Sequence, residues 1–488
     1  ISGNMGLKNI EDVISPTTGK TIGQVAISTD LDIENALVAA SHFQKKWNNI
    51  GGEARAEILD RAANKLEKKC LTLMRLIAEE AGRTLEDGLS EVREAVDFLR
   101  YYAGQARENF TKAKLLPGPT GERNALYLQG RGTFLCISPW NFPLAIFMGQ
   151  VSAALAAGNA VIAKPAEQTP IIATEAVKIL HQSGVPVDIL HLLTGDGFTV
   201  GAKLVADERI SGVAFTGSTE TAKIINRSLA NRKGAIVPLI AETGGQNVMI
   251  VDSTALPEQV VDDTIASAFQ SAGQRCSALR VLYIQDDVAE TIIPMLKGAM
   301  NCLNIGCPLD VSTDIGPVID RDAREILVKH AARMDGEATL INAVKPPSQY
   351  EGGTFFGPRL YEISSLDELK TEVFGPILHV IRYKASRLDD IMTQIQNTGF
   401  GLTLGVHSRI EESANYIFKN LDVGNTYVNR NIVGAAVGVQ PFGGHGLSGT
   451  GPKAGGPRYL YRFATEKTLT INTVATGGNT ELFSMEEE

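Results

Sequence analysis

The sequence lacks the features that would mark a secreted protein. It contains only five cysteines in 488 residues, and an odd number at scattered positions argues against a disulfide framework. Its first residues show neither a basic stretch nor a following apolar one, so no secretory signal is indicated. A reducing cytoplasm is therefore the expected location. The chain also begins without Met, which favours a domain excised from a longer parent chain over a separate subunit.

Positive charge and long apolar runs are also scarce. Lys and Arg total 46 against 55 Asp and Glu, and a net charge of -9 argues against a nucleic-acid-binding surface. The most apolar stretch, residues 144–163, is interrupted by Gln150, Ser152 and Asn159, so no transmembrane segment is expected. Its Gly-Asn turn predicts a helix followed by a strand.

The pattern of apolar residues indicates an α/β protein of at least two domains, because 488 residues exceed what one core holds. Residues 31–110 are predicted to form three helices, with Cys70 on a buried stripe. From about residue 132, short apolar runs alternate with helical segments, which is typical of parallel sheets covered on both faces. A second such region begins near Glu242. Residues 125–130 and 464–474 alternate like exposed strands, for which a sister subunit is the natural partner.

Three polar segments could carry chemistry. Cys276 lies in GQRCSALR beside Arg275, and a nearby cation can lower the pKa of a thiol and favour the nucleophilic thiolate; the alternative is an inert cysteine. Glu242 follows an apolar strand in PLIAETGGQN, where a buried carboxylate can act as a general base; the alternative is a solvated strand end. Asn141 in SPWNFP could donate to an oxyanion, or simply cap a helix.

Two further segments suggest a nucleotide. Lys164 and Glu167 follow a strand in AKPAEQTP, in position to contact ribose hydroxyls. Gly217 and Ser218 open a helix in FTGSTETAK, where backbone amides can face a pyrophosphate. The second segment lacks the G-x-G-x-x-G pattern and is weak evidence alone.

These five segments, with EVFGP at 372–376 and PFGG at 441–444, resemble the aldehyde dehydrogenase superfamily in order and across nearly the whole chain. The resemblance implies a Rossmann-type NAD-binding domain (1–113 and 132–241), an α/β catalytic domain (242–460) and a small β oligomerisation hairpin with a tail (114–131 and 461–488). It also implies a homo-oligomer and NAD as cofactor, with no metal.

Carried over residue by residue, the resemblance makes Cys276 the nucleophile, Glu242 the base and Asn141 the oxyanion donor. The residues that it places around the cofactor are Ile137, Pro139, Trp140, Lys164, Glu167, Gly217, Ser218, Glu372 and Phe374. Two positions depart from the common pattern: Ala222 stands where many members have Gly, and Gln150 where many have Lys. If that Lys relays a proton during deacylation, this chain relays it otherwise.

Segments 271–282, 428–444 and 446–463 further resemble the pyrroline-5-carboxylate dehydrogenase part of proline utilization A, whose parent chains carry a proline dehydrogenase domain. This implies oxidation of the aldehyde L-glutamate γ-semialdehyde to L-glutamate. A carboxylate substrate needs partners in its pocket, which Ser277 and the Gly434-Ala435 turn can supply, with Phe142 and Phe442 as apolar walls. Phe442 and Gly434 could instead be loop packing. The rival hypotheses are another semialdehyde dehydrogenase and a non-catalytic NAD-binding scaffold.

Overall fold

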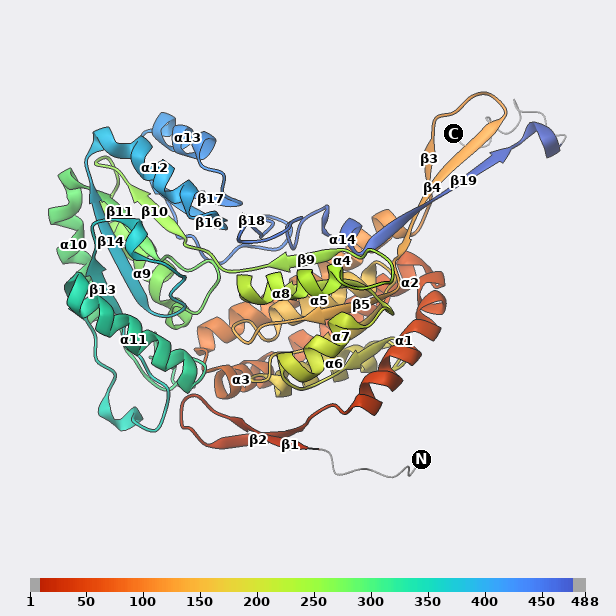
Figure 1. The fold of residues 1–488 in the computed structure, drawn as a ribbon, viewed down its shortest axis with the longest axis horizontal. Coiled ribbons are helices and arrows are strands. Elements are labelled where there is room, and N and C mark those ends of the chain that lie inside the picture. Colours follow the sequence, from red (N-terminus) through yellow and green to blue (C-terminus); the bar gives the residue numbers. More distant parts are fainter. Residues whose placement is uncertain (1–8, 477–488) are drawn as a thin grey trace.

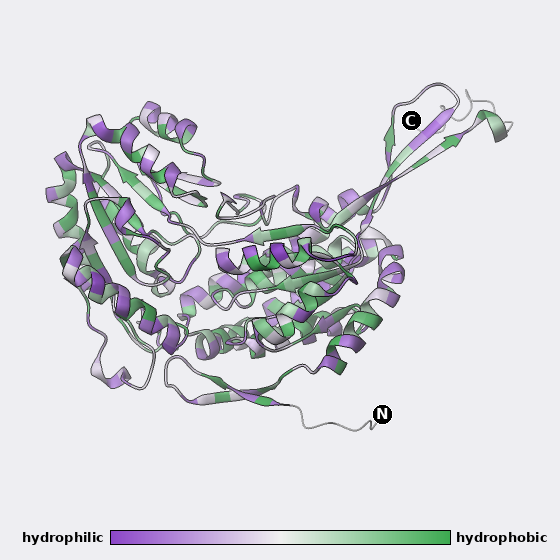
Figure 2. Cartoon of the chain, viewed as in Figure 1, coloured by the Kyte–Doolittle hydropathy of each residue, from purple (hydrophilic) through white to green (hydrophobic). Residues whose placement is uncertain are grey.

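The computed structural model describes residues 9–476, which form two α/β lobes and a projecting arm (Figure 1). Apolar residues concentrate on the strands and on the helix faces that cover them (Figure 2). Each lobe is built on its own sheet, and buried apolar side chains form a separate core cluster around each. The alternating apolar runs therefore predicted the α/β class and its two sheets correctly.

The first lobe contains a five-stranded parallel sheet in the order β7-β6-β5-β8-β9. Its central strands are buried on both faces, as expected for a sheet covered by helices. The strands are β5 (Thr133–Ile137), β6 (Ala160–Lys164), β7 (Leu190–Leu192), β8 (Ile210–Thr216) and β9 (Leu239–Glu242). Because the strands are parallel, their carboxyl ends meet at one edge, which lies towards the second lobe (Figure 1).

The helices of this lobe correct one prediction. Residues 31–110 form four helices rather than three: α1 (Asp30–Asn49), α2 (Gly51–Lys68), α3 (Cys70–Ala81) and α4 (Leu85–Phe110). The apolar stripe from Leu59 to Ile77 runs through a break at Lys69, so periodicity alone could not show it. Cys70 begins α3 and is only half-buried, against the edge of the core, rather than inside it.

The predicted helix and strand on either side of the Gly-Asn turn are confirmed as α5 (Ala145–Ala156) and β6. Gly158 has a φ of +94°, and a Cβ there would lie 2.6 Å from Asn48 Oδ1, so a side chain would be both strained and crowded. The remaining helices of the lobe are α6 (Pro170–Ser183), α7 (Ala202–Ala206) and α8 (Thr219–Ala230), with a π-helical turn η1 (Gly197–Gly201) before α7. A hairpin of β1 (Ile10–Ile14) and β2 (Thr21–Ala26) precedes α1.

The second lobe contains a seven-stranded sheet in the order β12-β13-β14-β11-β10-β16-β17, parallel except for the β12–β13 pair. Its strands are β10 (Val248–Val251), β11 (Val281–Gln285), β12 (Thr339–Ala343), β13 (Arg359–Glu362), β14 (Ile377–Tyr383), β16 (Thr403–His407) and β17 (Asn425–Val428). Its helices are α9 (Pro257–Phe269), α10 (Asp286–Asn301), α11 (Arg321–Glu337), α12 (Leu388–Asn397) and α13 (Glu411–Asn420). Four short 3₁₀ turns connect them: η2 (Gln270–Gly273), η3 (Ser348–Tyr350), η4 (Leu366–Glu368) and η5 (Ala385–Arg387).

The arm is a three-stranded antiparallel sheet in the order β19-β4-β3, and it projects from the first lobe (Figure 1). It consists of β3 (Lys114–Leu116), β4 (Glu122–Gly130) and β19 (Ala464–Asn472), followed by the turn η6 (Val474–Thr476). Both segments predicted as exposed strands form, but they pair with each other along nine residues. The chain returns to the arm through a loop region that holds β18 (His445–Gly446), paired with β15 (Phe400–Gly401), and the short α14 (Tyr459–Arg462).

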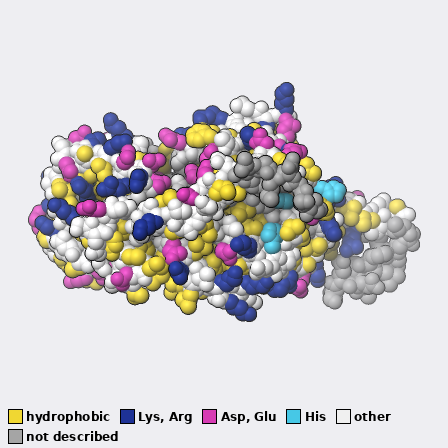
Figure 3. Space-filling view, turned by 90° about the horizontal axis from the view of Figure 1, so that it is seen from below, with side chains coloured by type: hydrophobic (Ala, Val, Ile, Leu, Met, Phe, Trp, Pro, Cys, Tyr) yellow, Lys and Arg dark blue, Asp and Glu magenta, His cyan; other side chains and the backbone are white. Residues whose placement is uncertain are grey.

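The charge of the surface and the polarity of the helices indicate what the molecule can contact. On the face that Figure 3 shows, Lys and Arg are interspersed with Asp and Glu. Within residues 9–476, the helices are too short or too polar to span a membrane.

Candidate active site

The first sheet brings four of the predicted segments to one edge. Ile137, the last residue of β5, pairs with Lys164 of β6, and Thr216 of β8 pairs with Glu242 of β9. Parallel α/β sheets place their ligands at the carboxyl ends of the strands, where the loops diverge. The loops after β5, β6, β8 and β9 therefore converge on one possible site.

Glu242 is buried within a cradle of glycines from the PFGG loop and its surroundings. One carboxylate oxygen, Oε2, accepts a 3.3 Å hydrogen bond from the backbone N–H of Gly444, and Oε1 has no partner within the protein. A Cβ at Gly443 would lie 2.7 Å from Oε1, so this loop approaches the carboxylate closely because it lacks side chains. Burial raises the pKa of Glu242 well above its usual value, against opposing effects of the Gly444 bond and Lys453. A carboxyl group with a raised pKa suits a general base near neutral pH.

Cys276 follows a backbone segment with an uncommon conformation. Ser271 and Ala272 both have positive φ values, 57° and 54°, which non-glycine residues rarely adopt. A Cβ at Gly273 would lie 2.3 Å from the carbonyl oxygen of Gly375, so only glycine fits there. Holding two consecutive non-glycine residues in the left-handed conformation costs free energy. Such a conformation persists only where the surrounding structure enforces it, often at functional sites.

The Cys276 thiol does not gain the cationic environment that the neighbouring Arg275 suggested. The guanidinium of Arg275 pairs instead with Asp87, at 2.7 Å, and donates to Ser271 Oγ. Burial raises the pKa of Cys276 to about 12, and the nearby Glu372 and Glu242 carboxylates add to the effect. Ionisation of this thiol therefore requires a base or an approaching positive charge.

Cys276 and Glu242 line one cavity of about 470 Å³ between the lobes and α4. All five residues predicted to contact the substrate line it as well: Phe142, Ser277, Gly434, Ala435 and Phe442. Gly434 has a φ of +72°, a conformation that favours glycine. The structure thus brings together seven predicted residues from five separate segments of the chain.

Asn141 lies beside this cavity rather than on its lining. Its side chain is buried, and its amide Nδ2 donates a 3.2 Å hydrogen bond to the carbonyl oxygen of Gln274, two residues before Cys276. The same residue accepts a hydrogen bond at its backbone oxygen from Arg83 Nη1. Asn141 is therefore next to the nucleophile segment, as an oxyanion donor would have to be.

The predicted adenosine-ribose residues lie at the end of β6. Lys164 is almost fully buried, and its Nζ donates to the carbonyl oxygen of Pro165 and lies 3.8 Å from Glu167 Oε2. Burial lowers the pKa of Lys164, while Glu167 and Asp196 oppose that effect. The Glu167 side chain is about half exposed, so its carboxylate is accessible to hydroxyl groups.

Gly217 and Ser218 open α8 as predicted. Ser218 is the N-cap residue, and its Oγ accepts from the backbone N–H of Thr221, while the N–H of Gly217 donates to the carbonyl oxygen of Glu242. The first turn of α8 thus starts beside the base, and its free N–H groups can bind an anion.

Glu372 and Phe374 lie on the opposite side of the site, on the second lobe. Glu372 Oε1 accepts from Arg280 Nη2 at 3.1 Å, and a Cβ at Gly244 would lie 1.8 Å from its Oε2. Phe374 makes an edge-on contact with Trp140, with ring centroids 5.6 Å apart. Trp140, in the loop after β5, therefore contacts the EVFGP segment, and Ile137 and Pro139 belong to the same stretch of chain.

A model of the aldehyde dehydrogenase family matches residues 5–469. The chain belongs to the aldehyde dehydrogenase family. Among curated relatives, bifunctional protein PutA of Klebsiella aerogenes is 52% identical over 467 residues, which cover 94% of this chain and 35% of PutA. The 1-pyrroline-5-carboxylate dehydrogenase of Geobacillus sp. (strain WCH70) is 34% identical over 92% of this chain and 87% of its own length. The chain spans about a third of the length of the PutA relatives.

Solved structures agree with this assignment. A bifunctional proline utilization A (PutA) protein superposes with a TM-score of 0.91 at 56% identity, covering 93% of this chain and 46% of that one. The 1-pyrroline-5-carboxylate dehydrogenase from Thermus with bound NAD superposes with a TM-score of 0.91 at 32% identity, covering 95% and 90%. The predicted aldehyde dehydrogenase fold is confirmed.

Sequence analysis of this aldehyde dehydrogenase missed part of the cavity wall. Glu94, Asp97 and Arg93 of α4 line the cavity opposite the predicted residues. Burial raises the pKa of Glu94 to about 7, with repulsion from Glu91 adding to it. Their helix carries many charged residues, so nothing local distinguished those that face the site.

The two departures from the family pattern have clear positions. Gln150 lines the cavity, and its Nε2 donates at 2.9 Å to Oγ1 of Thr216, the residue that pairs with Glu242 on the neighbouring strand. Ala222 is in the first turn of α8 and packs against the first core. Within residues 9–476, no group of three or more acidic, His or Cys side chains could hold a metal ion.

Proposed function

We propose that this chain oxidises L-glutamate γ-semialdehyde to L-glutamate with NAD as the oxidant. The single observation that carries the proposal is the cavity that Cys276 and Glu242 share with a candidate carboxylate site and with the carboxyl groups of Glu94 and Asp97. The names of the relatives, PutA and 1-pyrroline-5-carboxylate dehydrogenase, support the same substrate.

The residues present suit a two-step oxidation. Glu242 removes the proton of the Cys276 thiol, and the sulfur attacks the aldehyde carbon to form a thiohemiacetal. Asn141 Nδ2 turns from the Gln274 carbonyl to the developing oxyanion and stabilises it. Glu242 then passes the thiol proton to solvent. After loss of hydride, the ionised carboxylate takes a proton from a water that attacks the resulting thioester, and the C–S bond breaks to leave the Cys276 thiolate and release the acid.

NAD, when bound, supplies the hydride acceptor. The site fits NAD for three reasons. The accessible Glu167 carboxylate can accept hydrogen bonds from ribose hydroxyls, and the N-terminus of α8 offers backbone N–H groups. The Glu372 carboxylate is not blocked, because Gly244 beside it has no side chain. The solved Thermus structure contains NAD, which supports this choice. Glu167 would repel a 2′-phosphate, so NAD is expected to be preferred over NADP.

The cavity also suits both ends of an amino-acid aldehyde. Ser277 and the backbone at Gly434 and Ala435 can bind the substrate carboxylate, and Phe142 and Phe442 can pack on its methylenes. Glu94 and Asp97 can bind its ammonium group, which would favour the ionised form of Glu94.

We also propose roles for the larger parts. The first lobe would be the NAD-binding domain, the second the catalytic domain, and the arm the oligomerisation element, because the outer edges of β3 and β19 have no strand partner within residues 9–476. The chain would act as a homo-oligomer. Its location would be the cytoplasm, which its five unpaired cysteines support. The partial coverage of PutA supports a proline dehydrogenase domain in a longer parent chain.

Steady-state kinetics with glutamate semialdehyde, succinate semialdehyde and propanal, each with NAD and NADP, test the function. In Ser277→Ala, kcat/KM for glutamate semialdehyde should fall about ten- to a hundredfold, since a bond to a charged group is lost. Propanal has no carboxylate and should be nearly unaffected. An equal loss for both substrates would show that Ser277 supports Cys276 instead. A wild-type preference for succinate semialdehyde would make the chain a different semialdehyde dehydrogenase, and absence of NADH formation with every aldehyde would leave a binding scaffold.

A further inference from the structure

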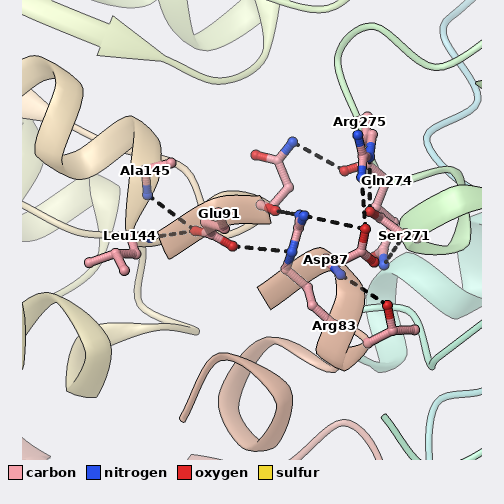
Figure 4. A network of polar contacts seen from close by, with 10 residues as sticks. Arg83, Asp87, Glu91, Leu144, Ala145, Ser271, Gln274 and Arg275 are labelled. Carbon is pink, nitrogen blue, oxygen red and sulfur yellow. Dashed lines mark hydrogen bonds and ion pairs between the residues drawn. The ribbon is translucent and has the colours of Figure 1, made fainter. Parts of the chain in front are cut away.

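A buried ionic network connects α4 to the two loops that carry Asn141 and Cys276 (Figure 4). Its charged members are Arg83, Asp87, Glu91 and Arg275, and each is at most 5% exposed. Buried charges are costly unless they are paired, so such a cluster needs close mutual contacts. The steps proposed above assign no role to any of the four.

Arg83 and Glu91 hold the loop that follows β5. Arg83 Nη1 donates to the backbone oxygen of Asn141, and its Nε lies 3.2 Å from Glu91 Oε2. The Arg83 guanidinium also lies over the Phe142 ring, 4.0 Å from its centroid. Glu91 Oε1 accepts from the backbone N–H groups of Leu144 and Ala145, at 2.7 and 3.2 Å, at the start of α5. The backbone from Asn141 to Ala145 is therefore held at several points.

Asp87 extends the network to the nucleophile. Its Oδ1 lies 3.8 Å from Arg83 Nη2 and accepts from Arg275 Nη2 at 2.7 Å. Burial raises the pKa of Asp87, but Arg83 and Arg275 outweigh burial and lower it overall, so this carboxylate is ionised at neutral pH. Because Asn141 Nδ2 donates to Gln274, a closed ring results: Arg83, Asn141, Gln274, Arg275 and Asp87.

We propose that Arg83 is a positioning residue for oxyanion binding, which fixes the backbone of Asn141 so that its amide stays beside Cys276. This inference rests on the proposed function, in which Asn141 donates to the oxyanion. Arg83 does not line the cavity, so it acts through Asn141 and not on the substrate. A displacement of about 1 Å in such a donor can cost about a hundredfold in rate.

A double-mutant cycle tests the proposal, with the rate of NADH formation in a single turnover as the measurement. Arg83→Met keeps the apolar stem and removes the guanidinium; it should lower this rate about ten- to a hundredfold, with the KM of the aldehyde and the Kd of NAD unchanged. In an Asn141→Ala background the same substitution should change the rate less than about threefold, because its route to the oxyanion is gone. Arg83→Lys retains a charged donor and should recover part of the rate.

Arg55 provides a matched control. It is as deeply buried as Arg83, but it donates to the carbonyl oxygens of Ala156, Trp47 and Asn48, far from the ring described above. Arg55→Met should lower the melting temperature and leave the single-turnover rate of the folded fraction unchanged. If Arg83→Met is not recovered folded, Arg83→Lys carries the same cycle, with a smaller expected loss.

Two results would overturn the inference. One is an equal loss of rate on changing Arg83 in both backgrounds, which would indicate a structural role; the other is a wild-type rate in the folded Arg83 variants. Failure of the proposed substrate appears differently, because the wild-type enzyme would then not reduce NAD with glutamate semialdehyde. The cycle can in that case be measured with propanal.

Discussion

The nucleophile and the base line one cavity and are held very differently. The Cys276 segment is fixed by left-handed backbone at Ser271 and Ala272 and by the buried ion pair of Arg275 with Asp87. Glu242 has one 3.3 Å hydrogen bond and an unpartnered oxygen within its glycine cradle. The nucleophile segment is thus held by several contacts and the side chain of the base by one.

This difference matches the chemistry that each residue would perform. The nucleophile forms a covalent bond and has to meet the aldehyde carbon and the oxyanion donor in one geometry. The base acts on two different protons, first on the thiol and later on a water. A carboxylate held by few contacts can act on both, and Gly443 and Gly449 lack the side chains that would crowd it.

Removal of the nucleophile should give the largest effect. Cys276→Ala removes the covalent route, so dehydrogenase activity should fall by several powers of ten while NAD binding survives. Steady-state NADH formation and NAD titration measure the two. Residual activity above about one per cent of wild type would contradict the assignment of Cys276.

Removal of the base should separate the two steps. Glu242→Gln should lower steady-state turnover about a hundred- to a thousandfold, because no group takes the proton of the hydrolytic water. Since the pKa of Glu242 is raised, wild-type turnover should also rise with pH as this carboxyl loses its proton, and the variant should lose that rise. In rapid-mixing experiments the burst of NADH should slow less than steady-state turnover, because solvent or buffer base can still accept the thiol proton. A burst that slows as much as turnover would mean that Glu242 is required equally at the thiol and at the water.

The smallest effect concerns Glu94 of α4, whose pKa is raised by burial and by the Glu91 carboxylate against the opposing charges of Arg275 and Arg83. The folded-state pKa of Glu94 is about 7, against 4.5 for the ordinary carboxyl group, so the folded protein binds this proton more tightly. Its contribution to the unfolding free energy is thus full below about pH 4.5 and is lost as the pH rises through about 7. Glu94→Gln cannot ionise, so the fall in melting temperature between pH 5 and pH 8 should shrink by roughly 2–4 °C.

Glu94→Asp retains a titrating group at the same place and serves as the control, because it should keep most of the pH dependence. Identical pH profiles for wild type and Glu94→Gln would show that another carboxyl group causes the fall. Differential scanning calorimetry at matched ionic strength makes the comparison.

Local sequence patterns predicted those features of the fold and the site that depend on residues close together in the sequence. Alternating apolar runs identified both sheets, and the Gly158-Asn159 turn located the end of α5. Cys276 and Glu242 could be found because glycines and polar residues surround them where apolar residues would be expected. They lie on the same cavity in the structure. Residue types alone left an inert alternative for each, and their roles came from the family resemblance.

The features that could not be predicted depend on contacts between segments far apart in the sequence. Arg275 and Asp87 are 188 positions apart, so their pairing could not be predicted from either local segment. The positive φ values at Ser271 and Ala272 could not be expected either, because these residue types rarely adopt them and tertiary contacts impose them. The break at Lys69 lacks Gly or Pro, so no local signal marks it.

The pairing of β19 with β4 has a consequence for folding. Residues 464–472 complete a ladder with residues 122–130, and Thr470 and Asn124 are 346 positions apart. Tyr459 and Phe463, just before that strand, belong to the core of the first lobe. During synthesis the first lobe therefore cannot complete its core until the whole second lobe has been made, and it exposes apolar surface until then. Order of synthesis and order of completion are reversed: the lobe made first is the one that finishes last.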